Sequence, residues 1–351
     1  MNNKKIIGIE FLRFLSMTSI LIYHFQHFAH TFEKNSQPFY KFLSIFYDHG
    51  YLGVQVFWCI SGVVFFYKYL DKILEKKIMF VNFLKLRFSR LYPLHFATLI
   101  IVLILQLIYE DLNGSFFVYI FDIKHFILNL FLINGWGLED QFSFNGPTWS
   151  VSIEIIIYII FFITFFYLRI YVGFLFSIIL FILIYFVSLA DGNIAYALFY
   201  FFIGGLISIS KYSAHKIFSN NLLKKYFFYL LGIFISLAII FIFNNNFLYK
   251  KFFLPITTIS LVYFFVLTNQ IFTQHEKFWS LLGNLTYGSY LIHFPVQLSL
   301  MIIFKIFNIE INIESTSLFL FYIMTTFIIS FFVYKNYELP AQRYIRSKYI
   351  K

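Results

Sequence analysis

The sequence predicts an all-α polytopic membrane protein with about ten transmembrane helices around one membrane-embedded core. Hydrophobic residues make up 60% of its 351 positions, charged residues only 12%, and the mean hydropathy is +0.78. A soluble domain would carry about twice that share of charge. The apolar residues also gather in runs of about 20 residues, the length that a helix needs to cross a bilayer.

Ten apolar runs define the expected spans. They lie near residues 6–28, 50–70, 91–109, 149–169, 171–189, 194–210, 226–243, 252–270, 284–305 and 315–335. A shorter run, Ile123–Asn134, is too brief for a crossing, so we expect it to lie along the interface or to re-enter. Residues 1–351 are therefore expected to form a single membrane domain, with no extramembrane domain.

The net charge of +11 indicates topology rather than nucleic-acid binding, because cytoplasmic loops of membrane proteins retain Lys and Arg. Basic residues follow the second span, precede the seventh and end the sequence: Lys68, Lys72, Lys76, Lys77, Lys85, Arg87, Arg90, Lys211, Lys216, Lys224, Lys225, Arg343, Arg346, Lys348 and Lys351. Ten crossings place them, and both termini, on the cytoplasmic side. Lys250 and Lys251 are exceptions, since the same count places them outside.

The N-terminal stretch MNNKKIIGIEFLRF begins like a signal peptide, but Glu10 and Arg13 interrupt its apolar region and no small-residue cleavage site follows. We expect an uncleaved first span. Cys59 is the only cysteine, so no intrachain disulfide can form, and its apolar surroundings favour a buried, unreactive thiol. No metal site is expected.

The first span carries two ionisable residues that need an explanation. A charge near the bilayer centre costs at least about 2.5 kcal/mol, so it marks either a compensated pair or a function. Arg13 and His24 are eleven residues apart, which returns them to within about 20° of one helix face and about 16 Å apart along it. The structural alternative is that Arg13 pairs with Glu10 and that His24 is a hydrogen-bonded core residue.

Two further stretches contain candidate residues, one for helix packing and one for phosphate binding. GYLGVQVFWCISG, from Gly50 to Gly62, contains small residues including Ser61, which permit close helix packing. RFSRLYP places Arg87 and Arg90 on one helical face, where two guanidiniums can hold phosphates, although a cytoplasmic anchor explains them equally well.

Later spans supply three more candidates. PTWSVSIE places Trp149 at the outer interface and Glu154 one and a half turns inside the membrane, at a depth comparable to His24. His293 lies in the ninth span, within LGNLTYGSYLIHFP. Buried ionisable groups of this kind need partners or a function.

These motifs, in this order and followed by YELPAQR, resemble the acyltransferase 3 family of integral membrane O-acyltransferases over essentially the whole chain. The resemblance implies a bacterial inner-membrane enzyme whose active site is membrane-embedded. Such an enzyme would move an acyl group, usually acetyl from acetyl-CoA as co-substrate, to a hydroxyl of an envelope polysaccharide or other glycan, without a bound cofactor. The resemblance also implies that Arg13, His24, Arg87 and Arg90 are essential and that Glu154 assists them.

The chemistry assigns roles to these residues as a hypothesis. Arg87, Arg90 and Arg13 would bind the acyl-CoA, while His24 would act as general base, with Glu154 either orienting its ring or stabilising the imidazolium. An acyl-histidine intermediate on His24 remains an alternative. Glu10, Ser61, Trp149 and His293 are supporting positions.

The rival function is a transporter or flippase of a lipid-linked glycan, which would also have about ten spans and buried ionisable residues. No internal repeat supports it. A third alternative is a scaffold in envelope assembly. The sequence selects neither the acceptor glycan nor an oligomeric state.

Overall fold

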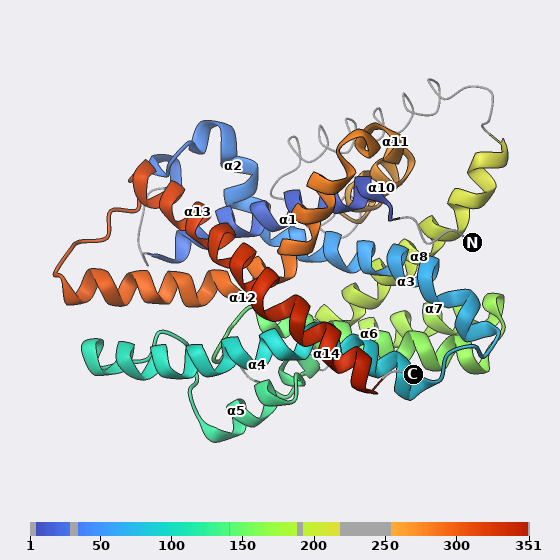
Figure 1. The fold of residues 1–351 in the computed structure, drawn as a ribbon, viewed down its shortest axis with the longest axis horizontal. Coiled ribbons are helices and arrows are strands. Elements are labelled where there is room, and N and C mark those ends of the chain that lie inside the picture. Colours follow the sequence, from blue (N-terminus) through green and yellow to red (C-terminus); the bar gives the residue numbers. More distant parts are fainter. Residues whose placement is uncertain (1–4, 29–33, 140, 188–191, 218–253, 350–351) are drawn as a thin grey trace. The chain divides into compact units, whose positions relative to one another are not determined.

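The computed structural model describes residues 5–28, 34–139, 141–187, 192–217 and 254–349, and every regular element among them is helical (Figure 1). The α-helices are α1 (Ile7–Phe25), α2 (Tyr40–His49), α3 (Gly53–Leu74), α4 (Phe80–Asn113), α5 (Ile123–Leu130), α6 (Thr148–Tyr167), α7 (Ile170–Val187), α8 (Asn193–Ile217), α10 (Leu254–Leu267), α11 (Asn269–Phe272), α12 (Glu276–Ile306), α13 (Thr316–Val333) and α14 (Leu339–Tyr349). The short 3₁₀ helices are η1 (Gln26–Phe28), η2 (Lys34–Ser36), η3 (Gly50–Leu52), η4 (Asn134–Trp136) and η6 (Thr273–His275), and η7 (Tyr334–Glu338) is a π-helical turn.

Seven described segments are long and apolar enough to cross a membrane. They are Ile7–Phe28, Tyr40–Leu74, Phe80–Asn113, Thr148–Tyr167, Asn193–Ser210, Asn269–Ile306 and Thr316–Lys348. Two shorter apolar helices cover Ile170–Leu183 and Pro255–Leu267. The predicted span 226–243, with the loop lysines at 224, 225, 250 and 251, lies outside the described residues, so the count of about ten stays a prediction.

Several helices continue beyond the apolar runs that predicted the spans. α4 begins at Phe80 rather than near residue 91, and α12 begins at Glu276 rather than near residue 284. Lys, Arg and Glu are good helix formers, so the end of an apolar run is not the end of a helix. The run Ile123–Asn134 yields only the eight-residue helix α5, which is too short to cross a membrane.

The chain divides into two compact units, and several helices contribute to both. The first unit comprises Met1–Leu15, Val54–Lys77 and Ile157–Gly283. Within it, α3 and α8 approach through glycines: a Cβ at Gly62 would overlap the carbonyl of Phe201, and one at Gly204 would overlap the carbonyl of Cys59. The small-residue packing predicted for the second span is confirmed here, and Cys59 is a buried free thiol.

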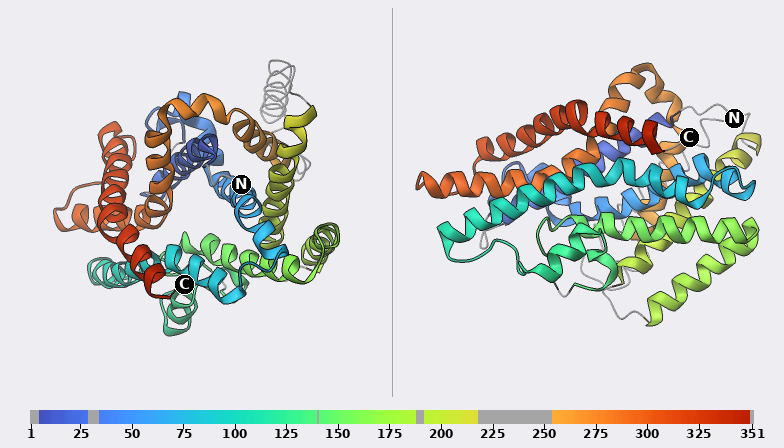
Figure 2. Two further views of the ribbon diagram at one scale, coloured as in Figure 1. Left: turned by 45° about the vertical axis from the view of Figure 1, so that its right-hand side comes forward. Right: turned by 60° about the horizontal axis from the view of Figure 1, so that its bottom comes forward.

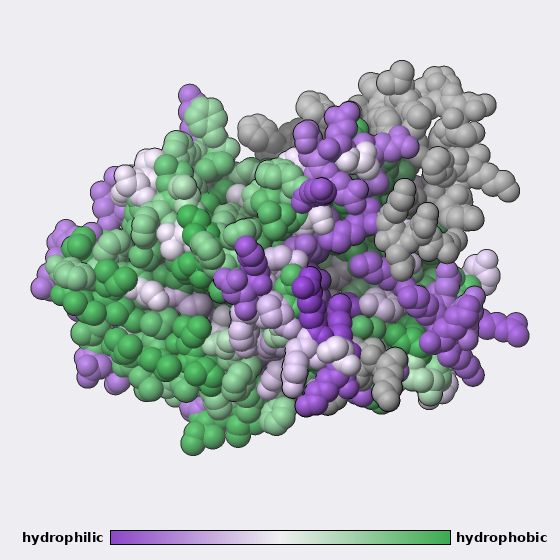
Figure 3. Space-filling view, in the orientation of Figure 1, coloured by the Kyte–Doolittle hydropathy of each residue, from purple (hydrophilic) through white to green (hydrophobic). Residues whose placement is uncertain are grey.

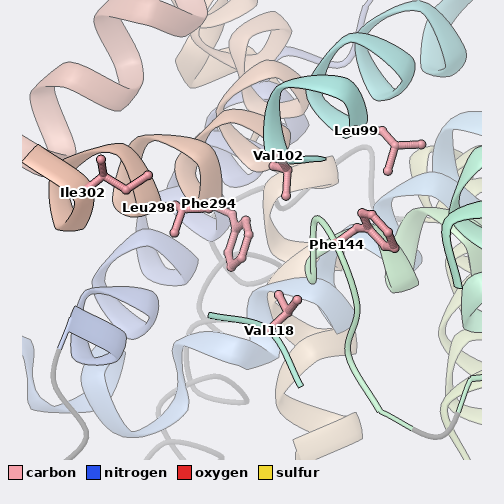
Figure 4. Packing of buried hydrophobic residues seen from close by; sticks show 7 residues of the cluster. All are labelled: Leu99, Val102, Val118, Phe144, Phe294, Leu298 and Ile302. Carbon is pink, nitrogen blue, oxygen red and sulfur yellow. The ribbon is translucent and has the colours of Figure 1, made fainter. Parts of the chain in front are cut away.

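The second unit comprises Ser16–Gly53, Ile78–Ile156 and Asn284–Lys351. Its hydrophobic cluster joins α4 and α12 to the segment between α4 and α6 (Figure 4). The buried members are Leu99, Val102, Val118, Phe144, Phe294, Leu298 and Ile302. This packing fixes α12, which carries His293, against α4.

α14 also lies along α4 in the second unit, as Figures 1 and 2 show. Arg346 of α14 donates from Nε to Ser89 Oγ of α4 at 3.1 Å. Figure 3 shows hydrophobic residues over α13 and the C-terminal parts of α4 and α12, whereas hydrophilic residues gather over α14. Exposed hydrophobic side chains of these helices, such as Ile104 of α4 and Phe321 and Met324 of α13, suit contact with lipid.

The segment between α4 and α6 is held by a buried polar network. Asn129 Nδ2 donates to Glu139 Oε1 at 2.9 Å and to Ser143 Oγ at 2.8 Å, and Ser143 Oγ donates to Glu139 at 2.6 Å. Thr148, the first residue of α6, donates from Oγ1 to Asn129 Oδ1 at 3.1 Å. Burial raises the pKa of the Glu139 carboxyl, although its hydrogen bonds act in the opposite direction.

Candidate active site

The C-terminal end of α1 leads into a pair of histidines. His24 is half-buried in the last turn of α1, and His27 is exposed in η1. Their Nδ1 atoms lie 3.0 Å apart, within hydrogen-bond distance. The tight 3₁₀ turn explains this contact, because side chains at i and i+3 eclipse one another there. Tyr23 lies edge-on to both imidazoles, which fixes the orientation of the pair.

α12 brings a third imidazole beside this pair. His293 is fully buried, and its ring centroid lies 4.8 Å from that of His24. The backbone carbonyls of Ser289 and Tyr290 are nearby, but neither ring nitrogen makes a hydrogen bond within the described residues. One turn later, Gln297 Nε2 donates to the backbone carbonyl of His24 at 3.2 Å. A buried polar group without a partner calls for an explanation, and a bound substrate would supply one.

The first turn of α6 is fastened to α12 by Tyr290. Its hydroxyl donates to the carbonyl of Pro147 at 2.9 Å and shares a 2.6 Å hydrogen bond with Ser150 Oγ. The ring of Tyr290 lies 5.8 Å from that of His293 between centroids. Glu154 is within electrostatic range of the Tyr290 hydroxyl. Polar contacts therefore link the start of α6 to Tyr290, whose ring lies beside that of His293.

Glu154 itself makes no hydrogen bond to His24. The sequence led us to expect that this carboxylate either orients the imidazole or stabilises the imidazolium. Among the described residues, the hydrogen-bond partner of the His24 ring is His27 instead. Any effect of Glu154 on His24 must therefore act through space or through other groups.

Arg13, in the first unit, forms an ion pair with Glu10. Arg13 Nη1 lies 3.2 Å from Glu10 Oε2, and Glu10 is buried. Glu10 packs against Gly283 of α12, where any Cβ would overlap its carboxylate. The structural pair that the sequence offered as an alternative is present, and it offsets both charges.

α4 carries Arg87 and Arg90, both half-buried, in the second unit. Pro93 follows them inside the helix, and since proline lacks an N–H it removes a helical hydrogen bond. The hydroxyls of Tyr287 and Tyr337 donate to backbone carbonyls of Leu91 and Pro93. These bonds hold the stretch that follows the arginines.

The other predicted positions lie on the expected helices. Ser61 is half-buried in α3, and Trp149 is half-buried in the first turn of α6. No group of three His, Cys, Asp or Glu side chains suited to a metal ion occurs in the part of the chain that the structure describes.

Sequence reasoning missed three residues of this site: His27, Tyr290 and Gln297. His27 follows His24 by three residues, and that spacing was an available signal. Tyr290 and Gln297 lie one helical turn either side of His293, but their contacts with Pro147 and the His24 carbonyl depend on the packing of distant segments.

Comparison with known proteins gives two similarities. The model of a family described as an acyltransferase domain matches residues 6–335. The chain is 32% identical over 116 residues to Acyltransferase MdmB of Streptomyces mycarofaciens, a match that covers 32% of this chain and 27% of that relative. No solved structure matches.

Proposed function

The chain belongs to the acyltransferase 3 family, and we propose that it is an integral membrane O-acyltransferase that moves acetyl from acetyl-CoA to a hydroxyl of a cell-envelope glycan. The family match over residues 6–335 carries this proposal. The enzyme would lie in the bacterial cytoplasmic membrane, with both termini in the cytoplasm. Acyl-CoA, glycan and lipid are the partners that this function requires.

Arg87, Arg90 and Arg13 are the proposed donor-binding residues. Guanidinium groups match the geometry of phosphates and make bidentate, charge-assisted hydrogen bonds with them. Arg87 and Arg90 are three residues apart on α4, so they can act on one ligand. Glu10 would compensate the charge of Arg13 when no donor is bound, since the two side chains already form an ion pair.

His24 is the proposed catalytic residue. A neutral imidazole can take the proton of the acceptor hydroxyl, or its nitrogen can attack the thioester and carry the acyl group. His293 is supported as a substrate-contacting group, because its buried ring lies beside His24 with both nitrogens unpaired among the described residues. An N–H at that position can donate to the oxyanion that forms from the thioester carbonyl.

Glu154 is proposed to favour the positive charge that develops on His24 during proton transfer. A carboxylate in a poorly solvated site stabilises a nearby cation even without direct contact. Its electrostatic interaction with the hydroxyl of Tyr290, whose ring lies beside that of His293, supports this role.

Envelope glycans of a deletion strain test the function. We expect mass spectrometry to show loss of O-acetyl groups with an unchanged amount of glycan, restored by the wild-type gene and not by His24→Ala. Loss of the glycan itself would instead identify a transporter or flippase. An unchanged glycan with unchanged O-acetylation would refute the proposed reaction.

A further inference from the structure

The contact between His24 and His27 imposes a condition on their protons. Two Nδ1 atoms 3.0 Å apart form a hydrogen bond only if one carries a proton and the other offers a lone pair. With the proton on His24 Nδ1, His24 Nε2 is an unprotonated acceptor. With the proton on His27, Nε2 of a neutral His24 is protonated and cannot act as a base.

The surroundings of His24 leave Nε2 as its reacting atom. Nδ1 lies within hydrogen-bond distance of His27 Nδ1, so Nε2 is the ring nitrogen outside that contact. The Tyr23 ring packs against the imidazole, and the Gln297 bond holds the backbone carbonyl of His24. His293 lies against the same ring.

We propose that His27 is the positioning residue of His24: it accepts a hydrogen bond from His24 Nδ1–H and so presents His24 Nε2, unprotonated, to the acceptor hydroxyl. The proposal rests on the acyl-transfer function proposed above. In a catalytic triad a carboxylate does this work, by holding the imidazole in one tautomer and stabilising the imidazolium. Here a second, neutral imidazole would do so.

The proton balance of the step is complete without another reactant. The hydroxyl O–H bond breaks as its proton moves to His24 Nε2, and the oxygen bonds to the thioester carbon. The C–S bond then breaks, and the thiolate of CoA takes the proton from Nε2. His27 Nδ1 accepts the hydrogen bond from His24 Nδ1–H throughout the step. This hydrogen bond stabilises the positive charge on the His24 imidazolium.

Two substitutions separate this role from a structural one. His27→Asn keeps an acceptor, Oδ1, near the place of the Nδ1 atom but loses the ring. His27→Phe keeps a ring against Tyr23, whose centroid now lies 5.6 Å from that of His27, but loses the acceptor. A structural role would favour Phe over Asn, whereas the proposed role favours Asn over Phe.

The assay is transfer of radiolabel from acetyl-CoA to endogenous glycan in membrane vesicles with equal amounts of each variant. We expect His27→Phe to lower the maximal rate about 10- to 100-fold with the half-saturating acetyl-CoA concentration unchanged, a part of what a general base contributes. His27→Asn should retain most of the rate. Full activity of His27→Phe, or equal loss in both variants, would overturn the proposal.

The wild-type protein and His24→Ala serve as controls that test the proposed function separately. If vesicles with the wild-type protein produce no labelled glycan, or no more than vesicles with His24→Ala, acyl transfer itself is refuted. A second measurement does not depend on activity. Nuclear magnetic resonance of protein in lipid, with ¹⁵N-labelled histidine rings, should show a protonated Nδ1 of His24 bonded to an unprotonated Nδ1 of His27, lost in His27→Phe. A proton on His27 Nδ1 instead would contradict the assignment.

Discussion

Replacement of Tyr290 by Phe tests whether the start of α6 is held in place by α12. The hydroxyl donates to the Pro147 carbonyl at 2.9 Å and shares a 2.6 Å hydrogen bond with Ser150 Oγ. The phenylalanine ring fills nearly the same space, so packing is kept while both bonds are lost. The variant therefore isolates the hydrogen bonds.

The expected cost follows from the burial of the groups left behind. A hydrogen bond contributes about 0.5–1.5 kcal/mol net, and a stranded buried partner costs about 1–3 kcal/mol. Ser150 Oγ can still donate to the Pro147 carbonyl, at 3.3 Å. The Ser150 hydroxyl and the Pro147 carbonyl would therefore each keep one hydrogen-bond partner. Tyr290→Phe should thus lower the free energy of unfolding by about 1–3 kcal/mol.

Ser150→Ala completes a double-mutant cycle. Tyr290 keeps its bond to Pro147 in this variant, so the loss should be about 1 kcal/mol. The double variant should lose less than the sum, by about 0.5–1.5 kcal/mol, because both single changes remove the same 2.6 Å bond.

Unfolding of the detergent-solubilised protein, followed by circular dichroism as the denaturing detergent is increased, provides the measurement. Tyr344→Phe is the matched control: that residue is 62% exposed, and its hydroxyl accepts a long, 3.5 Å hydrogen bond from Lys348 Nζ. It should change stability by less than about 0.5 kcal/mol. If Tyr290→Phe were as stable as this control, or the cycle strictly additive, the account of the α6–α12 connection would be wrong.

Three further predictions concern the donor, the charge of the site and pH. Arg87→Ala should weaken acetyl-CoA binding about 10- to 100-fold, since one charge-assisted hydrogen bond contributes about 1.5–3 kcal/mol; unaltered affinity in a calorimetric titration would exclude this role. Glu154→Gln should lower kcat and leave the KM for acetyl-CoA unchanged, and the opposite pattern would assign it to donor binding. The folded state raises the pKa of Glu139, so stability should fall as pH rises from the ordinary carboxyl pKa through the raised one. Glu139→Gln should remove that dependence in unfolding curves measured across this range.

The sequence predicted the helical class and the helices that carry each candidate, because apolar runs and polar loops alternate clearly. It did not predict helix ends where charged helix formers extend an apolar run, as in the stretch from Phe80 to Arg90. Apolar length measures what lies in lipid, whereas backbone hydrogen bonds determine where a helix stops. The segment that became α5 was correctly predicted to be too short to cross.

The site was predicted in part. The Arg13–Glu10 pair follows from a spacing of three on one helix, so local geometry sufficed. Glu154 was expected to orient the His24 ring or to stabilise its imidazolium, but α1 passes into a 3₁₀ turn that places His27 beside the ring. The contact of His293 with His24 joins residues far apart in sequence, and no local pattern encodes it.

The packing of Glu10 has a consequence for how the protein is made. Glu10 and Arg13 lie one turn apart on α1, so their ion pair can form as soon as that helix forms during synthesis. Gly283, against which the Glu10 carboxylate packs in the folded protein, leaves the ribosome only later. Membrane insertion of α1 therefore need not wait for α12, because the helix brings its own counter-charge into the bilayer and the later helix needs only to leave room for it.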